Sequence, residues 1–254
     1  MKSKKKTRII LFIIIMFIIL LADIGLILYL SAEYKKPAKV LEELAYTKGP
    51  RGKNTIYLEE AGELVPYLVL EHDYADSGNV ILLLKYLMDE PRNWNYGTAY
   101  YKNSTLDQYL NEKYLEIVSV KPKIVNTSIL ITSDNMKELE TINRKVFLLS
   151  MPEVGDYDKY LMLEEGKQLK YFRRKQNRIA YSEDGETKNW WLRTRDVSYG
   201  NICAFVVGKS GVCGSGDCKN NINRIRPAFC LPPDLPVTMQ ELDGEMVYVL
   251  ESDE

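Results

Sequence analysis

Histidine is almost absent from this chain, which has one such residue, His72, among 254. A single imidazole excludes a histidine-rich metal site, and any Ser-His-Asp triad would have to use His72. Neither charge dominates, since 34 Lys and Arg residues face 35 Asp and Glu residues. The chain has no basic patch of the kind that binds phosphate backbones, so nucleic acid is excluded as a general electrostatic partner. Internal repeats and low-complexity tracts are also absent.

Apolar residues, by contrast, are plentiful. Hydrophobic residues make up 46% of the chain and aromatic residues 11%. This composition excludes a disordered protein. About 220 residues lie outside the N-terminal apolar segment, which suits one domain, or at most two.

The N-terminal segment is the longest apolar stretch. A basic run over residues 2–8 precedes residues 9–22, which are apolar without interruption, and Asp23 separates these from residues 24–30. As a helix at about 1.5 Å per residue, residues 9–30 would span the roughly 30 Å hydrocarbon core of a membrane. The denser basic cluster is N-terminal, so the positive-inside rule places it in the cytoplasm. We expect a single-pass cell-membrane protein with an extracytoplasmic body.

Two alternatives bear on this segment. A cleaved signal peptide needs a shorter apolar core and a small-residue cleavage site, and residues 31–33 match that site poorly. Asp23 either contacts another membrane helix or lies far enough toward the outer end for its charge to be tolerated.

The rest of the chain divides by composition. Residues 31–54 are predicted to form a stalk with a short helix after Pro37. A helix with an apolar face is predicted after Ser104, among short strand-like runs at residues 66–71, 79–84, 145–149, 190–193, 202–207 and 226–231. A polar segment, residues 155–189, carries five bases within residues 170–178, which we interpret as a solvated face, with an anion site as the alternative. The expected parts are a cytoplasmic tail (1–8), an anchor (9–30), a stalk (31–54), a globular domain (55–236) and an acidic tail (237–254).

Four segments, in order, resemble a bacterial family of unknown function that carries a WWLRSPG signature. Residues 104–111 (STLDQYLN) resemble its S-x-L-R-x-W-L-N helix, and residues 146–150 (VFLLS) its FLLS strand. Residues 190–194 (WWLRT) resemble the signature itself, and residues 225–229 (IRPAF) its V-R-P-A strand. The resemblance covers roughly residues 56–233. It departs from the family at Arg195-Asp196, where Pro-Gly is usual, and at Tyr109, where Trp is usual.

This family resembles the C-type-lectin-like superfold, which also includes formylglycine-generating enzymes. The resemblance implies an α+β domain of short antiparallel strands and at least one packed helix, here behind the N-terminal transmembrane helix. It also implies a variable binding face on the final strands. It implies no activity, because function resides in sites rather than folds.

All four cysteines lie between residues 203 and 230. In an oxidising compartment they would form disulfides. The implied fold would bring Cys203 close to Cys230, and Cys213 and Cys218 bracket a short glycine-rich loop, so we expect these two pairs among the three possible connectivities. The alternative is a redox or copper site at Cys213 and Cys218, which have the C-x4-C spacing of formylglycine-generating enzymes at a different place in the chain.

The candidate ligand-binding residues lie in and after the double-tryptophan strand. Aromatic rings beside arginine are common at binding sites, although a strand that alternates its faces would place part of this motif in the core. The loops are the more favourable place for ligands, namely residues 194–201 and 209–223, with the stretch 155–185 as a further candidate. The candidates are Trp190, Arg193, Arg195, Asp196, Tyr199, Asp217, Asn220, Asn221 and Asn223.

Neither a metal site nor a cofactor is predicted. Calcium needs clustered oxygen ligands, and the calcium-binding patterns of lectins are missing around Asp217. Glu71-His72-Asp73 are consecutive, so their side chains do not converge on one substrate.

These observations predict a membrane-anchored, non-catalytic binding module whose partner is an unknown protein or surface glycan. One alternative is an envelope redox or copper enzyme acting through Cys213 and Cys218. Another is a structural or signalling partner of other membrane proteins, paired through Asp23.

Overall fold

The computed structural model describes residues 15–26, 37–48 and 54–250. The chain separates into two compact units, Met1–Pro37 and Ala38–Glu254. The first unit contains a helix over residues 15–26, which includes Asp23. Over its described residues, this helix lacks the length and apolar character that crossing a membrane requires.

The predicted transmembrane anchor is therefore wrong, together with the single-pass, extracytoplasmic placement that depended on it. Among the residues that the structure describes, no helix combines the length and apolar character that a membrane span requires. The ends of the expected anchor (9–14 and 27–30) and the basic tail (1–8) lie outside the described residues.

The second unit, here called the body, is built on a sheet of seven strands in the order β11-β12-β1-β2-β3-β10-β6. Six neighbouring pairs make up this sheet, and β1 with β12 is the parallel one. The strands are β1 (Thr55–Glu60), β2 (Glu63–Glu71), β3 (Val80–Leu84), β6 (Val146–Phe147), β10 (Ala228–Leu231), β11 (Val237–Leu242) and β12 (Glu245–Leu250). The hairpin expected from residues 66–71 and 79–84 is confirmed by β2 and β3, with Tyr67 opposite Leu84.

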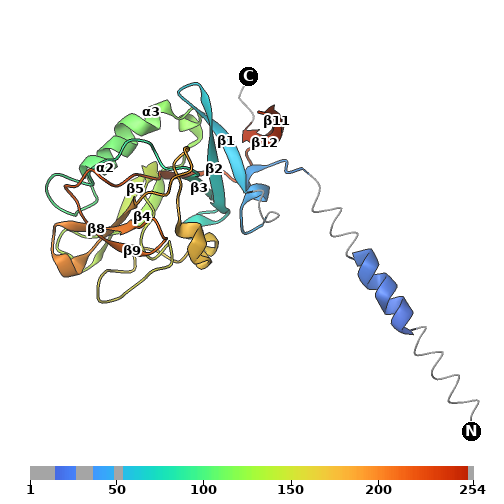
Figure 1. The fold of residues 1–254 in the computed structure, drawn as a ribbon, viewed down its shortest axis with the longest axis horizontal. Helices are drawn as coiled ribbons and strands as arrows, with labels where there is room; N and C mark the ends of the chain where they lie inside the picture. Colours follow the sequence, from blue (N-terminus) through green and yellow to red (C-terminus); the bar gives the residue numbers. More distant parts are fainter. Residues whose placement is uncertain (1–14, 27–36, 49–53, 251–254) are drawn as a thin grey trace, which may run out of the picture. The chain divides into compact units, whose positions relative to one another are not determined.

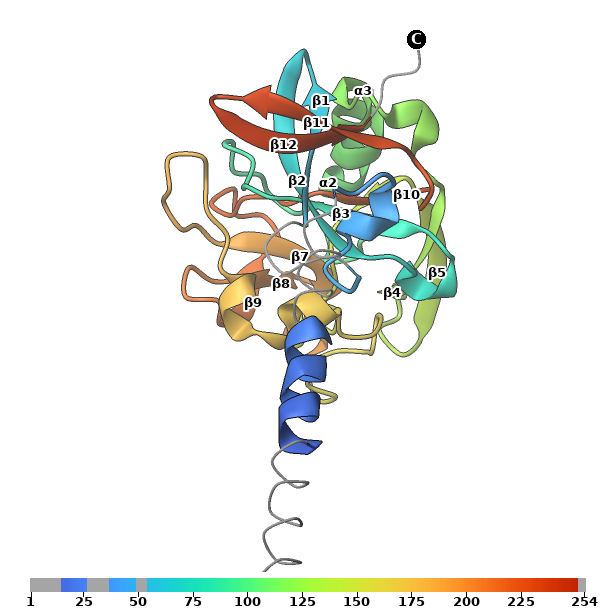
Figure 2. The ribbon, with the colours of Figure 1, turned by 90° about the vertical axis from the view of Figure 1, so that its right-hand side faces the viewer.

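Two smaller sheets complete the body. One pairs β4 (Thr127–Thr132) with β5 (Leu139–Arg144), and the other joins β7 (Trp190–Arg195), β8 (Cys203–Val207) and β9 (Cys213–Asp217) in that order. Figures 1 and 2 show β7–β9 and the β11–β12 hairpin at opposite ends of the body.

Within the described residues of the body, helical structure is limited to one longer stretch and several short 3-10 turns. The stretch runs through α2 (Thr105–Gln108), the π-helical turn η3 (Tyr109–Tyr114) and α3 (Leu115–Ile117). As predicted, Ser104 caps it, because its hydroxyl accepts the Asp107 N–H at 3.1 Å. Leu106, Leu110 and Tyr114 form its buried face. The 3-10 turns are η1 (Leu41–Leu44), η2 (Tyr74–Asp76), η4 (Lys121–Lys123), η5 (Lys170–Arg173), η6 (Lys175–Arg178) and η7 (Val197–Tyr199).

The predicted fold class, an α+β C-type-lectin-like domain behind a membrane helix, is therefore wrong. The body consists mostly of three β-sheets with little helix. The prediction undercounted strands, in one case because the strand contains no β-branched residue. That strand, β9, has the sequence CGSGD and is held in its sheet by backbone pairing with β8.

The body extends beyond both expected boundaries of the globular domain. Leu41 and Leu44, expected in a stalk, are fully buried in the core, and the Leu41 N–H donates to the Leu235 carbonyl at 2.8 Å. The expected acidic tail contains the hairpin β11–β12, whose turn is Asp243-Gly244, both at positive φ. Tyr248 and Val249 of this hairpin are buried.

Candidate functional site

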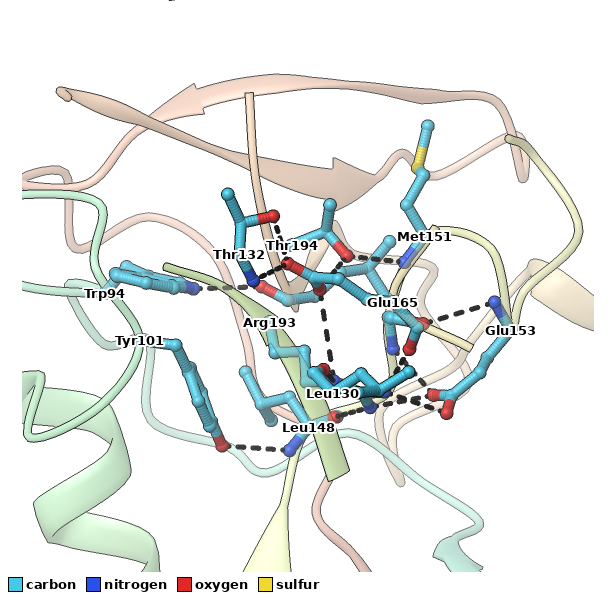
Figure 3. Close-up of polar contacts among 12 residues, drawn as sticks. Trp94, Tyr101, Leu130, Thr132, Leu148, Met151, Glu153, Glu165, Arg193 and Thr194 are labelled. Carbon is cyan, nitrogen blue, oxygen red and sulfur yellow. Dashed lines mark hydrogen bonds and ion pairs between the residues drawn. The ribbon is translucent and has the colours of Figure 1, made fainter. Parts of the chain in front are cut away.

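The arginine of the double-tryptophan strand lies in a closed ionic cluster rather than at a surface (Figure 3). Arg193 is 1% exposed, and its guanidinium holds Glu153 through two bonds, Nη1 to Oε2 at 2.8 Å and Nη2 to Oε1 at 2.9 Å. The remaining N–H groups donate to backbone carbonyls of Leu130, Leu148 and Glu165. This pattern satisfies all the donors of a buried arginine, which is the condition for its tolerance in a core.

Two buried glutamates belong to this cluster, and each has further partners. Glu153 accepts the Tyr74 hydroxyl at 2.6 Å and the Ser150 N–H at 2.8 Å. Glu165 accepts the N–H and hydroxyl of Thr132, both at 2.7 Å, and the Thr194 hydroxyl at 2.6 Å. Burial raises the pKa of Glu165, although Arg193 opposes the shift. Burial is the largest single effect on Arg193 and disfavours its charged form, but Glu153, Tyr74 and Glu165 together outweigh it and raise the arginine pKa.

The cluster holds a loop of the body, the segment 153–165, in place. Glu153 and Glu165 are the two ends of the segment 153–165. Glu153 attaches the first end to β7, and Glu165 attaches the second end to both β4 and β7. A second buried arginine, Arg178, contacts the first residues of the same segment, 154–156. Its Nε donates to the Val154 carbonyl at 2.7 Å and its Nη1 pairs with Asp156 at 3.3 Å. The indole N–H of Trp190 holds the Arg178 carbonyl at 3.0 Å. Residues of the sequence signature therefore position a loop far from them in sequence.

That loop forms one wall of a pocket of about 450 Å³. Asp156, Asp158 and Leu161 come from the loop, and the opposite wall comes from the β7–β9 sheet and η7. Phe205, Cys213 and Ser215 lie on one face of the sheet, since the register sets Phe205 opposite Ser215 and Val207 opposite Cys213. Tyr199 of η7 lies at the rim with 62% of its surface exposed.

The polar groups of this pocket are partly engaged with one another. Asp196, which follows β7, accepts the Ser198 N–H at 2.9 Å and the Ser198 hydroxyl at 2.6 Å, and its other oxygen accepts the Ser215 hydroxyl. This carboxylate ties η7 to β9. Burial and the neighbouring Asp156 raise the pKa of the Cys213 thiol to about 12, so Cys213 is a thiol at neutral pH. Asp158 accepts the Tyr160 N–H at 2.9 Å through Oδ1, and no described residue forms a side-chain hydrogen bond with its Oδ2 or with the Tyr199 hydroxyl, so both groups can contact a ligand.

Two of the predicted binding residues, Asp196 and Tyr199, line this pocket. Trp190, Arg193 and Arg195 are buried and make structural hydrogen bonds instead. The Arg195 Nη1, for example, donates to the Ser133 carbonyl at 2.9 Å.

The predicted residues after β9 do not line the pocket. Asp217 accepts the Lys219 N–H at 2.9 Å in a turn that also contains Asn220 and Asn221. Asn223 is buried and its carbonyl accepts the Arg92 N–H at 2.9 Å. Within the described ranges no group of acids, histidines and cysteines has the arrangement of a metal site.

The expected disulfides are not formed, since all four cysteines are free thiols. Cys213 begins β9 and Cys218 follows its last residue, so the expected tight loop is an extended strand. At about 3.3 Å per residue their Cα atoms lie roughly 16 Å apart, beyond the reach of a disulfide. Cys203 begins β8 of the three-stranded sheet, whereas Cys230 pairs with Ile81 in the seven-stranded sheet. The same separation removes the geometric basis for a redox or copper site at Cys213 and Cys218.

Sequence reasoning named the stretch 155–185 as a possible ligand-binding loop but singled out neither Asp156 nor Asp158, and it missed the buried role of Arg178. The run at 170–178 was interpreted as a solvated face, yet Arg178 is 4% exposed. One available signal was the grouping of Asp156, Tyr157, Asp158 and Tyr160, a dense set of acids and aromatics inside a segment with no regular periodicity.

These features define a mainly β domain with a buried arginine–glutamate cluster and a polar pocket beside it. The family model for a domain of unknown function (DUF6273) matches residues 77–233, which is more than half of the chain, and the chain belongs to this family. The expected membership of a family of unknown function is thus confirmed, whereas the expected signature and the relation to lectin-like domains are not. No curated protein and no solved structure matched the chain.

Proposed function

We propose that the chain is a non-catalytic binding module whose pocket beside Tyr199 takes a neutral, hydroxyl-rich ligand such as a glycan. The observation that carries this proposal is the pairing of an exposed tyrosine ring with carboxylates around one pocket of about 450 Å³. That volume lies within the range of small-molecule sites.

The chemistry of the walls supports a glycan over other ligands. Carboxylates accept hydrogen bonds, and the hydroxyls of a sugar donate them. The ring of Tyr199 offers an apolar face with a polar edge, which suits the C–H face of a sugar ring. Asp156, Asp158 and Asp196 give the pocket an acidic character that opposes anionic ligands.

The rigid support of the pocket favours binding without large rearrangement. The Arg193 cluster holds both ends of segment 153–165, and Asp196 holds η7 to β9. A site whose walls are fixed in advance loses less conformational freedom on binding.

The proposal is tested with the full chain on a glycan microarray, followed by titration calorimetry with the oligosaccharide that binds most strongly. Tyr199→Ala and Asp158→Asn are expected to weaken binding by about tenfold or more, since each removes a direct contact. Tyr181→Ala is the matched control, because Tyr181 is another exposed tyrosine that does not line the pocket. Absence of binding to every glycan, or equal binding by all variants, would overturn the proposal, and capture of a protein through Tyr199 would favour a protein partner.

A further inference from the structure

A second cleft, of about 330 Å³, lies where the strands β1, β2 and β3 meet the helical stretch. Glu60 ends β1, Leu84 ends β3, and Tyr109 begins η3, so three separate elements converge there. This cleft shares no lining residue with the pocket beside Tyr199. It therefore requires an explanation of its own.

The charges around this cleft are unbalanced. Four carboxylate side chains line it, those of Glu60, Asp89, Glu90 and Glu183, against one cation, Arg92. Arg92 is partly engaged, since its Nη2 pairs with Glu90 at 3.0 Å, whereas its buried Nε has no hydrogen-bond partner among the described residues. In the part of the chain that the structure describes, the other three carboxylates have no ion pair. A cationic ligand would meet uncompensated negative charge here.

The rest of the lining is apolar and aromatic. Leu84, Leu87 and Met88 contribute aliphatic surface, and Tyr86 and Tyr109 contribute rings. The guanidinium carbon of Arg92 lies 3.6 Å from the centroid of the Tyr109 ring, so this wall already holds one cation by stacking. An occupant with carbon atoms next to its charge would match both kinds of surface.

Glu60 is the most strongly held of the acids. Its Oε1 accepts hydroxyls from Tyr67 and from Tyr114, the latter at 2.7 Å. No described residue forms a hydrogen bond with its Oε2, and that oxygen is not a buried orphan. Two phenols thus orient the carboxyl group while one oxygen stays open to a ligand. Burial raises the pKa of Glu60 to about 7, and a bound cation would favour its ionised form.

We propose that this cleft binds a small organic amine, with the ammonium group on Glu60 and its carbon chain against Tyr86, Leu87 and Met88. The volume suits a short alkylamine or diamine. This inference is independent of the proposed glycan pocket.

The test is calorimetric titration of the full chain with 1,5-diaminopentane and with pentylamine at about pH 8, above the pKa of Glu60. 1-Pentanol serves as a neutral probe of the same length. Both amines are expected to bind and the alcohol is not. Glu60→Gln retains an acceptor for the two phenols and is expected to weaken amine binding by about tenfold, because it removes the counter-ion.

A second variant, Glu183→Gln, guards against a folding defect at the half-buried Glu60, because Glu183 is exposed. It is expected to weaken binding by about two- to fivefold. Asp184→Asn is the matched control, since it removes the same charge one residue away and does not line the cleft. Absence of amine binding, equal binding of pentanol, or equal losses in Glu183→Gln and Asp184→Asn would each overturn the proposal.

Discussion

Arg193 and Glu153 face each other as a two-bond pair in the core, with N···O distances of 2.8 and 2.9 Å and side chains that are 1% and 3% exposed. They are 40 residues apart in the chain. The pair joins the signature strand β7 to the start of the loop that walls the pocket. The pair explains how a charged side chain is tolerated in β7, a strand in which every residue is buried.

Replacing this arginine by a residue of similar length tests how much the body depends on it. Arg193→Met leaves Glu153 buried without its counter-charge, so we expect a loss of about 3–5 kcal/mol in the free energy of unfolding. Denaturant unfolding of the full chain measures this loss. Arg173→Met is the control, because Arg173 is exposed, and should change stability by less than about 0.5 kcal/mol. Similar stability of the two variants would contradict a structural role for the cluster.

Two glycines of the edge strand β9 provide a matched pair of substitutions. A Cβ at Gly216 would lie 2.8 Å from the ring of Trp191, whereas a Cβ at Gly214 has no atom within 4 Å. Gly216→Ala is expected to cost about 1–3 kcal/mol through overpacking, and Gly214→Ala to be nearly neutral. Thermal unfolding of both variants compares them directly. A loss at Gly214 as large as that at Gly216 would show that the Trp191 contact is not the cause.

The pH dependence of the free energy of unfolding should reveal the raised pKa of Glu60. Its pKa rises from 4.5 to about 7 on folding, so the folded state retains a proton that the unfolded state releases. Stability due to this group is therefore greatest below pH 4.5 and falls as pH rises through about 7, with an upper bound of about 3 kcal/mol. Glu60→Gln should remove this slope and be more stable than wild type at pH 8.

Melting temperatures measured between pH 4 and pH 9 follow this change. Glu183→Gln is the control and should keep the slope of the wild-type chain. Parallel curves of melting temperature against pH for wild type and Glu60→Gln would contradict this prediction, because they would mean that Glu60 has the same pKa in the folded and unfolded states.

Thiol labelling distinguishes the four free cysteines of the structure from the two disulfides expected from the sequence. Alkylation of the denatured full chain without reductant should add four labels, because all four cysteines are free. In the native state Cys203 should react first, since it is the least enclosed of the four thiols. Burial raises the pKa of Cys213, Cys218 and Cys230 to about 12, which leaves little reactive thiolate. Intact mass and peptide mapping give both results, and fewer than four labels would reveal a disulfide.

Local features of the sequence predicted several local features of the fold. The cap at Ser104 and the spacing of Leu106, Leu110 and Tyr114 marked the helical stretch, because capping and periodicity act within a few residues. The hairpin β2–β3 was predicted for the same reason. The turn Asp243-Gly244 carried an equally local hairpin signal, but the acidity of the segment outweighed it in the prediction of a tail.

Reasoning from local sequence features identified only some of the residues of the candidate site. Asp196 and Tyr199 were identified because they follow a recognisable strand. Asp156 and Asp158 were not singled out within the stretch 155–185, because they line the pocket only after Arg178 and the Arg193 cluster have fixed their loop. Whether a basic residue is buried depends on the partners it meets, and those partners are distant in sequence.

By itself, then, the sequence determined the family, the capped helix and the strand that carries Trp190, Trp191 and Arg193. Only the tertiary structure decided that β1 runs parallel to β12, that the two expected cysteine pairs lie apart, and that Arg193 holds the loop that forms a pocket wall. The physical reason is that strand pairing uses backbone groups common to every residue, so the sequence marks which segments extend but not which segments meet.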